Sequence, residues 1–159
     1  MTATSTMTHK ETPKTGDSVV TAERFATGMT TFADWMGSIQ KNAELFQRHY
    51  DEFTPNPVDI GKLKSYISNN GVKALLLGTD WCPDVWRGLP VAAKVAEASG
   101  LELRIFERDA NSDMMAEFLK DGEFESVPTI VLYDGDNNYL GHWIERADQA
   151  NAEMGPLRE

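Results

Sequence analysis

The sequence predicts an α/β domain in which a mixed central sheet is covered by helices on both faces. Residues 72–78 form a short, continuous apolar run between turn residues, which is typical of a central strand buried on both faces. A helical pattern and an alternating strand pattern follow, and a strand–helix–strand unit requires parallel strands. Two further strand patterns are joined by the turn-rich residues 134–138. That closing hairpin requires an antiparallel pair, so the sheet is mixed.

Residues 21–58 are expected to be an N-terminal helical extension. Thr31 and Asp34 have the spacing of a capping box, which predicts the start of its longer helix. Apolar side chains then recur at three- and four-residue spacing and make one stripe, namely Phe32, Trp35, Met36, Ile39, Ala43, Phe46 and Tyr50. We expect this stripe to pack against the domain that follows. The alternative is a homodimer or partner surface, because a lone helix does not need so many aromatic side chains.

Residues 59–159 are expected to form the sheet domain. Its predicted elements are a helix at 59–69, a strand at 72–78, a helix at 83–99, a strand at 101–107, a helix at 112–119, strands at 127–133 and 139–144, and a short helix from about 148. Each of the first three helices has apolar residues on one side and a glycine close after its end (Gly71, Gly100 and Gly122), where the chain can turn left-handed.

Composition excludes several functional classes. The chain has 159 residues, 41% of them hydrophobic, and a net charge of −10, so nucleic acids and anionic membranes are not expected partners. One cysteine excludes an intrachain disulfide and suits a reducing compartment. Residues 1–20 are rich in threonine, without an apolar block, and are expected to be a disordered tail rather than a signal peptide. With no apolar stretch long enough to span a membrane, we expect a cytoplasmic protein.

Cys82 directly follows the predicted central strand and opens the next helix. The N-terminus of a helix presents unpaired N–H groups and the positive end of the helix dipole, and both favour a thiolate. The thiolate is the attacking species in thiol–disulfide exchange. A lone cysteine is more often an inert buried residue. Here the position at a strand–helix junction, and Pro83 as the next residue, favour a nucleophile. No cofactor is predicted, and no metal site, because His9, His49 and His142 are widely scattered.

Two further prolines stand at unusual positions. Pro90 lies inside a predicted helix, where it should remove a hydrogen bond and kink the helix. Pro128 interrupts the start of an apolar strand, where a proline usually marks an edge or a special turn. We predict a cis peptide bond between Val127 and Pro128, which would turn the backbone toward Cys82.

The segment Trp81-Cys82-Pro83-Asp84-Val85 resembles the Trp-Cys-x-x-Cys active site of the thioredoxin-like family. Pro90 matches the kink proline of that family, and Val127-Pro128-Thr129, with Pro128 at 128 − 82 = 46 residues after the cysteine, matches its cis-proline loop. The resemblance covers about residues 59–159 and implies a thioredoxin-like three-layer sandwich, here with the helical extension added. More narrowly, the chain resembles a bacterial subgroup of thioredoxin-like proteins with a single-cysteine motif.

The departures from the family pattern concern one half of its mechanism. The resolving cysteine of the family falls on Val85, so the dithiol cycle cannot run within one chain. The buried acidic residue that assists the resolving thiol falls on Leu76. Both differences remove the step in which a resolving thiol of the same chain attacks, which leaves at most a one-thiol version of the chemistry.

The resemblance also implies a substrate-binding surface. It makes Trp81 a flat contact that shields the sulfur, and it lets Pro128 and Thr129 hold the substrate backbone. Pro83, Asp84 and Val127 complete the predicted set. Asp84 is either a carboxylate stabilised by the helix dipole or an acceptor for a proton from a bound thiol.

Two functions from different classes remain open on the sequence. The preferred hypothesis is a monothiol oxidoreductase in which Cys82 attacks mixed disulfides of proteins and low-molecular-weight thiols. The alternative is a non-catalytic binding or redox-sensing module that uses the same fold. Absence of the resolving thiol and of the buried acid favours the alternative, whereas the placement of Cys82 favours the first.

Overall fold

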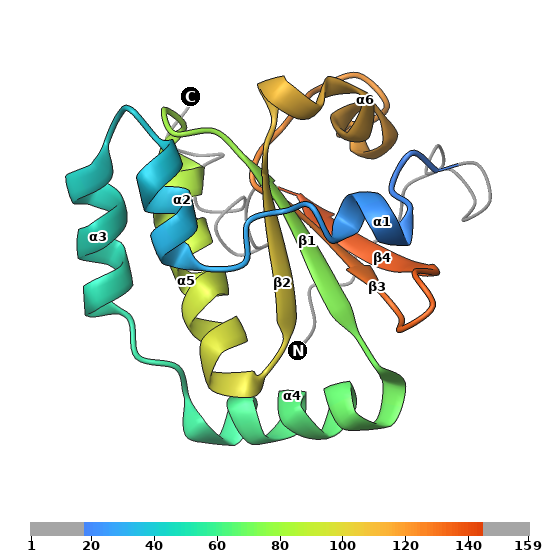
Figure 1. Ribbon diagram of the computed structural model, residues 1–159. Coiled ribbons are helices and arrows are strands. Elements are labelled where there is room, and N and C mark those ends of the chain that lie inside the picture. Colours follow the sequence, from blue (N-terminus) through green and yellow to red (C-terminus); the bar gives the residue numbers. More distant parts are fainter. Residues whose placement is uncertain (1–17, 145–159) are drawn as a thin grey trace.

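The computed structural model describes residues 18–144, which form a four-stranded sheet with helices on both faces (Figure 1). The predicted tail up to residue 17 and the predicted last helix lie outside the described residues. The helices are α1 (Ala22–Phe25), α2 (Phe32–Ser38), α3 (Ala43–Glu52), α4 (Pro57–Asn70), α5 (Pro83–Ser99) and α6 (Ser112–Met115). The strands are β1 (Lys73–Gly78), β2 (Glu102–Glu107), β3 (Thr129–Tyr133) and β4 (Tyr139–Ile144).

The sheet has the mixed topology that the sequence predicts. Its strand order is β2-β1-β3-β4; β1 pairs parallel with β2 and antiparallel with β3, and β3 and β4 form the closing hairpin. The centre of β1 is fully enclosed, since residues 74–77 are each 0% exposed. The continuous apolar run therefore reflects burial on both faces of the sheet.

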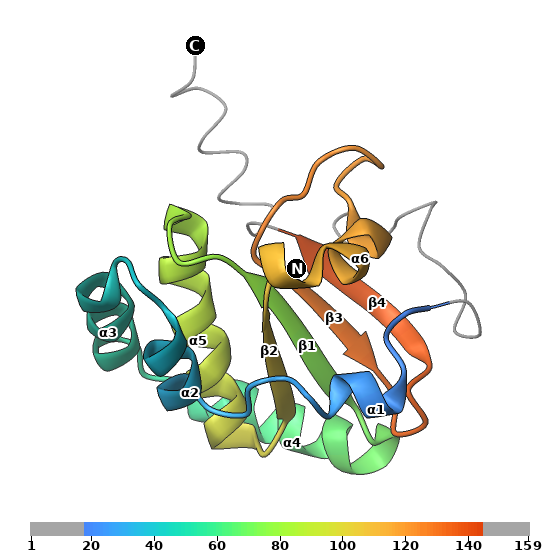
Figure 2. The ribbon, with the colours of Figure 1, turned by 45° about the horizontal axis from the view of Figure 1, so that its top comes forward.

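Different helices cover the two faces, as the alternation of side chains along β1 requires. Gly78 lies beneath α5, where an added Cβ would come within 3.0 Å of Val85 Cγ1. Lys73, five residues earlier and on the opposite face, places its Nζ 4.6 Å from the ring centroid of Phe25 in α1. Figure 2 shows α5 on one side of the sheet and α1 and α6 on the other. This is the three-layer arrangement implied by the family resemblance.

The N-terminal extension differs from the predicted helix. Thr31 and Asp34 do form the capping box that opens α2, but the helix ends at Ser38 and α3 begins only at Ala43. The break has a long-range cause. The Asp80 carboxylate accepts the backbone N–H groups of Gln40 and Lys41 at 2.9 and 3.1 Å, and the Asp80 carbonyl accepts Asn42 Nδ2 at 2.8 Å. These bonds replace helical ones, and Asn42 turns the chain with φ 64°.

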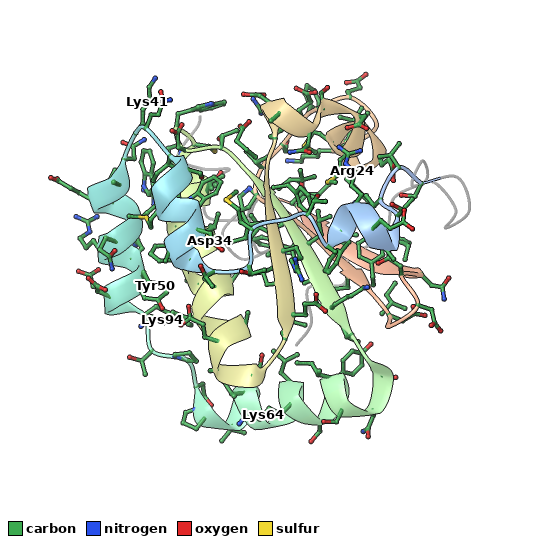
Figure 3. The ribbon with its side chains drawn as sticks, viewed as in Figure 1. Arg24, Asp34, Lys41, Tyr50, Lys64 and Lys94 are labelled. Atoms are coloured by element: carbon green, nitrogen blue, oxygen red, sulfur yellow. The ribbon has the colours of Figure 1, made fainter. Side chains whose placement is uncertain are left out.

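The apolar stripe of the extension packs within this chain, as predicted. Phe32, Trp35 and Phe46 are at most 5% exposed, and the Trp35 and Phe46 rings meet edge to face at 5.5 Å. α3 packs along α5, where the Tyr50 hydroxyl donates to Glu97 at 2.6 Å and Lys94 Nζ lies 4.3 Å from the Tyr50 ring centroid. Figure 3 shows Tyr50 and Lys94 together at this contact. The stripe is thus part of the core and joins the extension to α5.

Two other segments differ from their predicted form. The helix predicted at 112–119 is a single α-turn, α6, between the 3₁₀ turns Asp109–Asn111 and Ala116–Phe118. The tighter turn brings residues three apart onto one side, and Met115 and Phe118 are both buried there. At the other end of the chain, Val20 is 3% exposed and Ser18 Oγ donates to Glu117 at 2.6 Å. The last residues of the expected tail therefore contact the fold.

Candidate active site around Cys82

Cys82 lies at the junction of β1 and α5, as predicted. It is the N-cap residue of α5, and its carbonyl accepts the N–H groups of Val85 and Trp86 at 3.0 and 3.2 Å. The side chain is half-buried, and its sulfur lies 3.8 Å from the carbonyl oxygen of Val127. The peptide bond between Val127 and Pro128 is cis, which confirms that prediction. The fold thus brings together two segments about 45 residues apart in the chain.

Pro128 also packs against the helix that Cys82 opens. A Cβ added at Gly88 would lie 3.4 Å from Pro128 Cγ, at van der Waals distance, so Pro128 lies next to this position of α5. Pro90 is buried inside α5, and the helix continues past it to Ser99. The cis-proline loop therefore lies against Cys82 at the start of α5 and against Gly88 further along the same helix.

The predicted substrate-binding residues differ in accessibility. Trp81 is 48% exposed and Pro83 is exposed, whereas Asp84 is half-buried. Val127 is 3% exposed, and Thr129 is fully buried with its hydroxyl donating to the Ser126 carbonyl at 2.8 Å. The side chains of Trp81 and Pro83 are therefore accessible from outside, whereas those of Val127, Pro128 and Thr129 are buried.

The position of the missing resolving thiol belongs to the hydrophobic core. Val85 is 0% exposed and faces Gly78 of β1. Leu76, at the position of the buried acid, is also 0% exposed. Neither side chain supplies a nucleophile or a proton, so the chemistry available at this site is that of the Cys82 sulfur with an external partner.

Asp80 and Arg108 border the site and were not among the predicted site residues. Asp80 holds the α2–α3 connection beside the motif through the three hydrogen bonds described above. Arg108 places its guanidinium carbon 5.2 Å from the ring centroid of Trp81 and donates from Nη1 to the Glu125 carbonyl at 2.9 Å. A sequence signal for both exists: the carboxyl ends of parallel strands meet at one edge of a sheet. Asp80 lies just after β1 and Arg108 just after β2.

Nothing in the described residues suggests a metal centre or a membrane anchor. Within residues 18–144, there is no group of three or more histidine, cysteine, aspartate or glutamate side chains that could hold a metal ion. No helix in that range is long and apolar enough to cross a bilayer.

Comparison with known proteins supports the fold. The family model for thioredoxin matches residues 29–158, so the match begins inside the N-terminal extension. A crystal structure of a protein of unknown function from Pseudomonas aeruginosa superimposes with a TM-score of 0.70 at 22% identity, covering 87% of this chain and 84% of that one. An HIV epitope scaffold has a TM-score of 0.69 at 24% identity, over 87% and 82% of the two chains. No curated protein sequence matches significantly. On its family match, the chain belongs to the thioredoxin family.

Proposed function

We propose that the protein is a monothiol thiol–disulfide oxidoreductase that acts on mixed disulfides through Cys82. One observation carries this proposal. The half-buried sulfur lies at the N-terminus of a 17-residue helix and 3.8 Å from the backbone of the cis-proline loop. A sulfur in that position is open to an incoming disulfide, and a cysteine thiolate is the species that attacks in such an exchange.

The proposed reaction has two exchange steps. In the first, the mixed disulfide joins a protein to a low-molecular-weight thiol, and the Cys82 thiolate attacks the sulfur of the small thiol. A new S–S bond to Cys82 forms, the old S–S bond breaks, and the protein sulfur leaves as a thiolate that takes a proton from water. In the second, a free low-molecular-weight thiolate attacks the small-thiol sulfur of the new disulfide. Cys82 leaves as a thiolate, and the two small thiols become one disulfide.

The buried apolar residues Val85 and Leu76 support a second candidate function. If the site is not used for exchange, the same surface serves as a non-catalytic binding or redox-sensing module. A binding module needs the fold and the exposed Trp81 but not a reactive sulfur. A redox-sensing module needs Cys82 to be oxidised reversibly but needs no turnover of a substrate.

The Cys82→Ser variant separates the two candidates. The reporter is a protein carrying glutathione on one cysteine, mixed with reduced glutathione, and the measurement is the release of the reporter thiol. We expect the wild-type chain to accelerate release and to appear in mass spectra as a Cys82–glutathione adduct. The variant should show the uncatalysed rate and no adduct.

The Ala98→Ser variant is the matched control, because it introduces serine at an exposed position of the same helix, α5. It should keep the wild-type rate. Equal rates for wild type and Cys82→Ser would exclude the oxidoreductase and leave the binding or redox-sensing module.

A further inference from the structure

Arg108 contacts two segments that lie beside Cys82, the end of β1 with Trp81 and the loop that leads into the cis-proline. Its backbone N–H donates to the carbonyl of Gly78 at the end of β1, at 2.9 Å, so its main chain is anchored beside the motif. Its guanidinium carbon lies 5.2 Å from the ring centroid of Trp81. Nη1 donates at 2.9 Å to the carbonyl of Glu125, two residues before Val127. One side chain therefore joins the motif to the loop that leads into the cis-proline.

The chemistry of the side chain suits this position. The guanidinium is planar and always charged, and it can stack on an aromatic ring while donating hydrogen bonds from its edge. Nε of Arg108 also donates to Asp109 at 3.0 Å, and the side chain is only 15% exposed. With its plane held at two edges, Arg108 presents a fixed surface to the indole of Trp81.

The two segments that Arg108 joins are also the two that flank the reactive sulfur. Trp81 directly precedes Cys82, and the sulfur of Cys82 faces Val127. A disulfide that approaches Cys82 must pass these segments. The exposed indole of Trp81 contributes to substrate binding only if it keeps one orientation relative to the cis-proline loop, because a mobile ring loses part of its contact energy to ordering.

We propose that Arg108 is a positioning residue, which holds Trp81 and the loop at 125–129 in the arrangement that receives the substrate. This inference rests on the proposed function of Cys82. It also makes a structural claim that does not need catalysis: without Arg108, the indole of Trp81 loses its fixed orientation while the fold persists.

Arg104 of β2 offers a closely matched control. Its Nη1 donates to the Ala26 carbonyl at 2.6 Å, and its Nε donates to the Glu102 carboxylate at 3.2 Å. Its guanidinium carbon lies 5.8 Å from the ring centroid of Phe25. The kinds of contact are those of Arg108, namely a backbone carbonyl, a neighbouring carboxylate and an aromatic ring, with an additional carbonyl at Gly28 3.4 Å from Nη1. They lie in α1, the residues directly after it and β2, and include no residue of the Cys82 site. A loss shared by both variants would therefore be a general effect on the fold.

The experiment compares Arg108→Gln, Arg108→Lys and Arg104→Gln with the wild-type chain. The first readout is ¹⁹F NMR of protein labelled with 5-fluorotryptophan, in which the Trp81 signal is identified by its absence from a Trp81→Phe variant. The second is the KM and kcat for the glutathionylated reporter protein. We expect Arg108→Gln to shift and broaden the Trp81 signal and to raise KM about tenfold, with little change in kcat. A cation–π contact and a hydrogen bond from a charged group together reach about 1.4 kcal/mol, which is equivalent to a tenfold change.

The two other variants define what would overturn the inference. Arg104→Gln should leave both the Trp81 signal and KM unchanged, and Arg108→Lys should recover part of both because it keeps the charge but not the planar fork. The inference is wrong if Arg108→Gln behaves like Arg104→Gln, or if only one of the two readouts changes. If the wild-type chain has no exchange activity, the proposed function fails and the substrate-positioning role fails with it, while the NMR signal still tests whether Arg108 orients Trp81.

Discussion

Val85 shows how one residue limits the chemistry of its neighbour. It lies in the first turn of α5, three positions after Cys82, and its side chain is enclosed against Gly78. Residues three apart on a helix lie on the same side, and the family pattern places the resolving cysteine at this position. With valine at this position, the chain has no second thiol near Cys82. The valine side chain instead packs α5 against β1.

The Val85→Cys variant should therefore regain a dithiol. After mild oxidation, we expect one intrachain disulfide, seen as no free thiols in the denatured protein and two after reduction. The loss of buried volume should lower the free energy of unfolding of the reduced form by about 1 kcal/mol.

Val95→Cys is the control for that experiment, because it makes the same substitution in α5 but 95 − 82 = 13 residues from Cys82. At about 1.5 Å per residue, that distance along a helix forbids a disulfide. Two free thiols in oxidised Val85→Cys would show that the first turn of α5 does not place the side chains as described.

The connection between α2 and α3 is the element that relates the extension to the site. Its backbone N–H groups at Gln40 and Lys41 are bonded to Asp80, the residue before Trp81. Figure 3 shows Lys41 at the end of this connection, away from the contact of Tyr50 with Lys94. α2, α3 and their connection thus contact the sheet domain beside the motif and also further along α5.

Replacing Asp80 by alanine tests this link. The variant leaves two backbone N–H groups without their charged acceptor, so we expect the free energy of unfolding to fall by about 1–2 kcal/mol, measured by urea denaturation. Asp136→Ala is the control, because the Asp136 carboxylate accepts no hydrogen bond within residues 18–144, and its effect should stay within about 0.5 kcal/mol. Equal effects of the two substitutions would contradict the role given to Asp80.

At the scale of the whole molecule, an ion pair joins α1 of the N-terminal segment to α6 on the face of the sheet opposite α5 (Figure 2). Arg24 in α1 donates to both carboxylate oxygens of Asp113 in α6, at 2.6 and 2.8 Å. Hydrogen bonding to Arg24 lowers the pKa of Asp113 from 3.8 to about 2. This clamp connects the extension to α6, and the Asp80 contacts connect it to the Cys82 motif.

The pH dependence of this clamp follows from the direction of the pKa shift. Because the pKa of Asp113 is lower in the folded chain, the stabilisation is fully present above pH 3.8 and is lost as pH falls through about 2. The Asp113 side chain is 54% exposed, so screening limits the effect to less than about 1 kcal/mol.

We expect Arg24→Gln to lower the free energy of unfolding at pH 7 by that amount. The difference from wild type in urea denaturation should shrink as pH falls from about 4 toward 2. The exposed Arg48 provides a comparison through Arg48→Gln, whose difference should be small at every pH. A difference for Arg24→Gln that stays constant down to pH 2 would show that Asp113 is not its partner in stability.

Local patterns were sufficient for much of the fold and for the centre of the site. β1, α5, the closing hairpin, the capping box at Thr31 and the cis-proline all follow from the properties of neighbouring residues. The break between α2 and α3 does not, because it depends on Asp80, a residue 39–40 positions away. Local apolar spacing runs through that break without interruption, so it predicted one helix.

By itself, the sequence determined an α/β domain with a mixed sheet and one thiol at a helix N-terminus, because strand burial, helix capping and proline geometry are local effects. The thioredoxin-like family was implied by the resemblance of the Cys82 motif and the prolines to the pattern of that family. Only the tertiary structure decided which residues surround that thiol. Asp80 and Arg108 enter the site because two parallel strands end at the same edge of the sheet, and the extension enters it through a hydrogen-bonded turn. Such contacts depend on how elements pack, which the order of residues along one element does not contain.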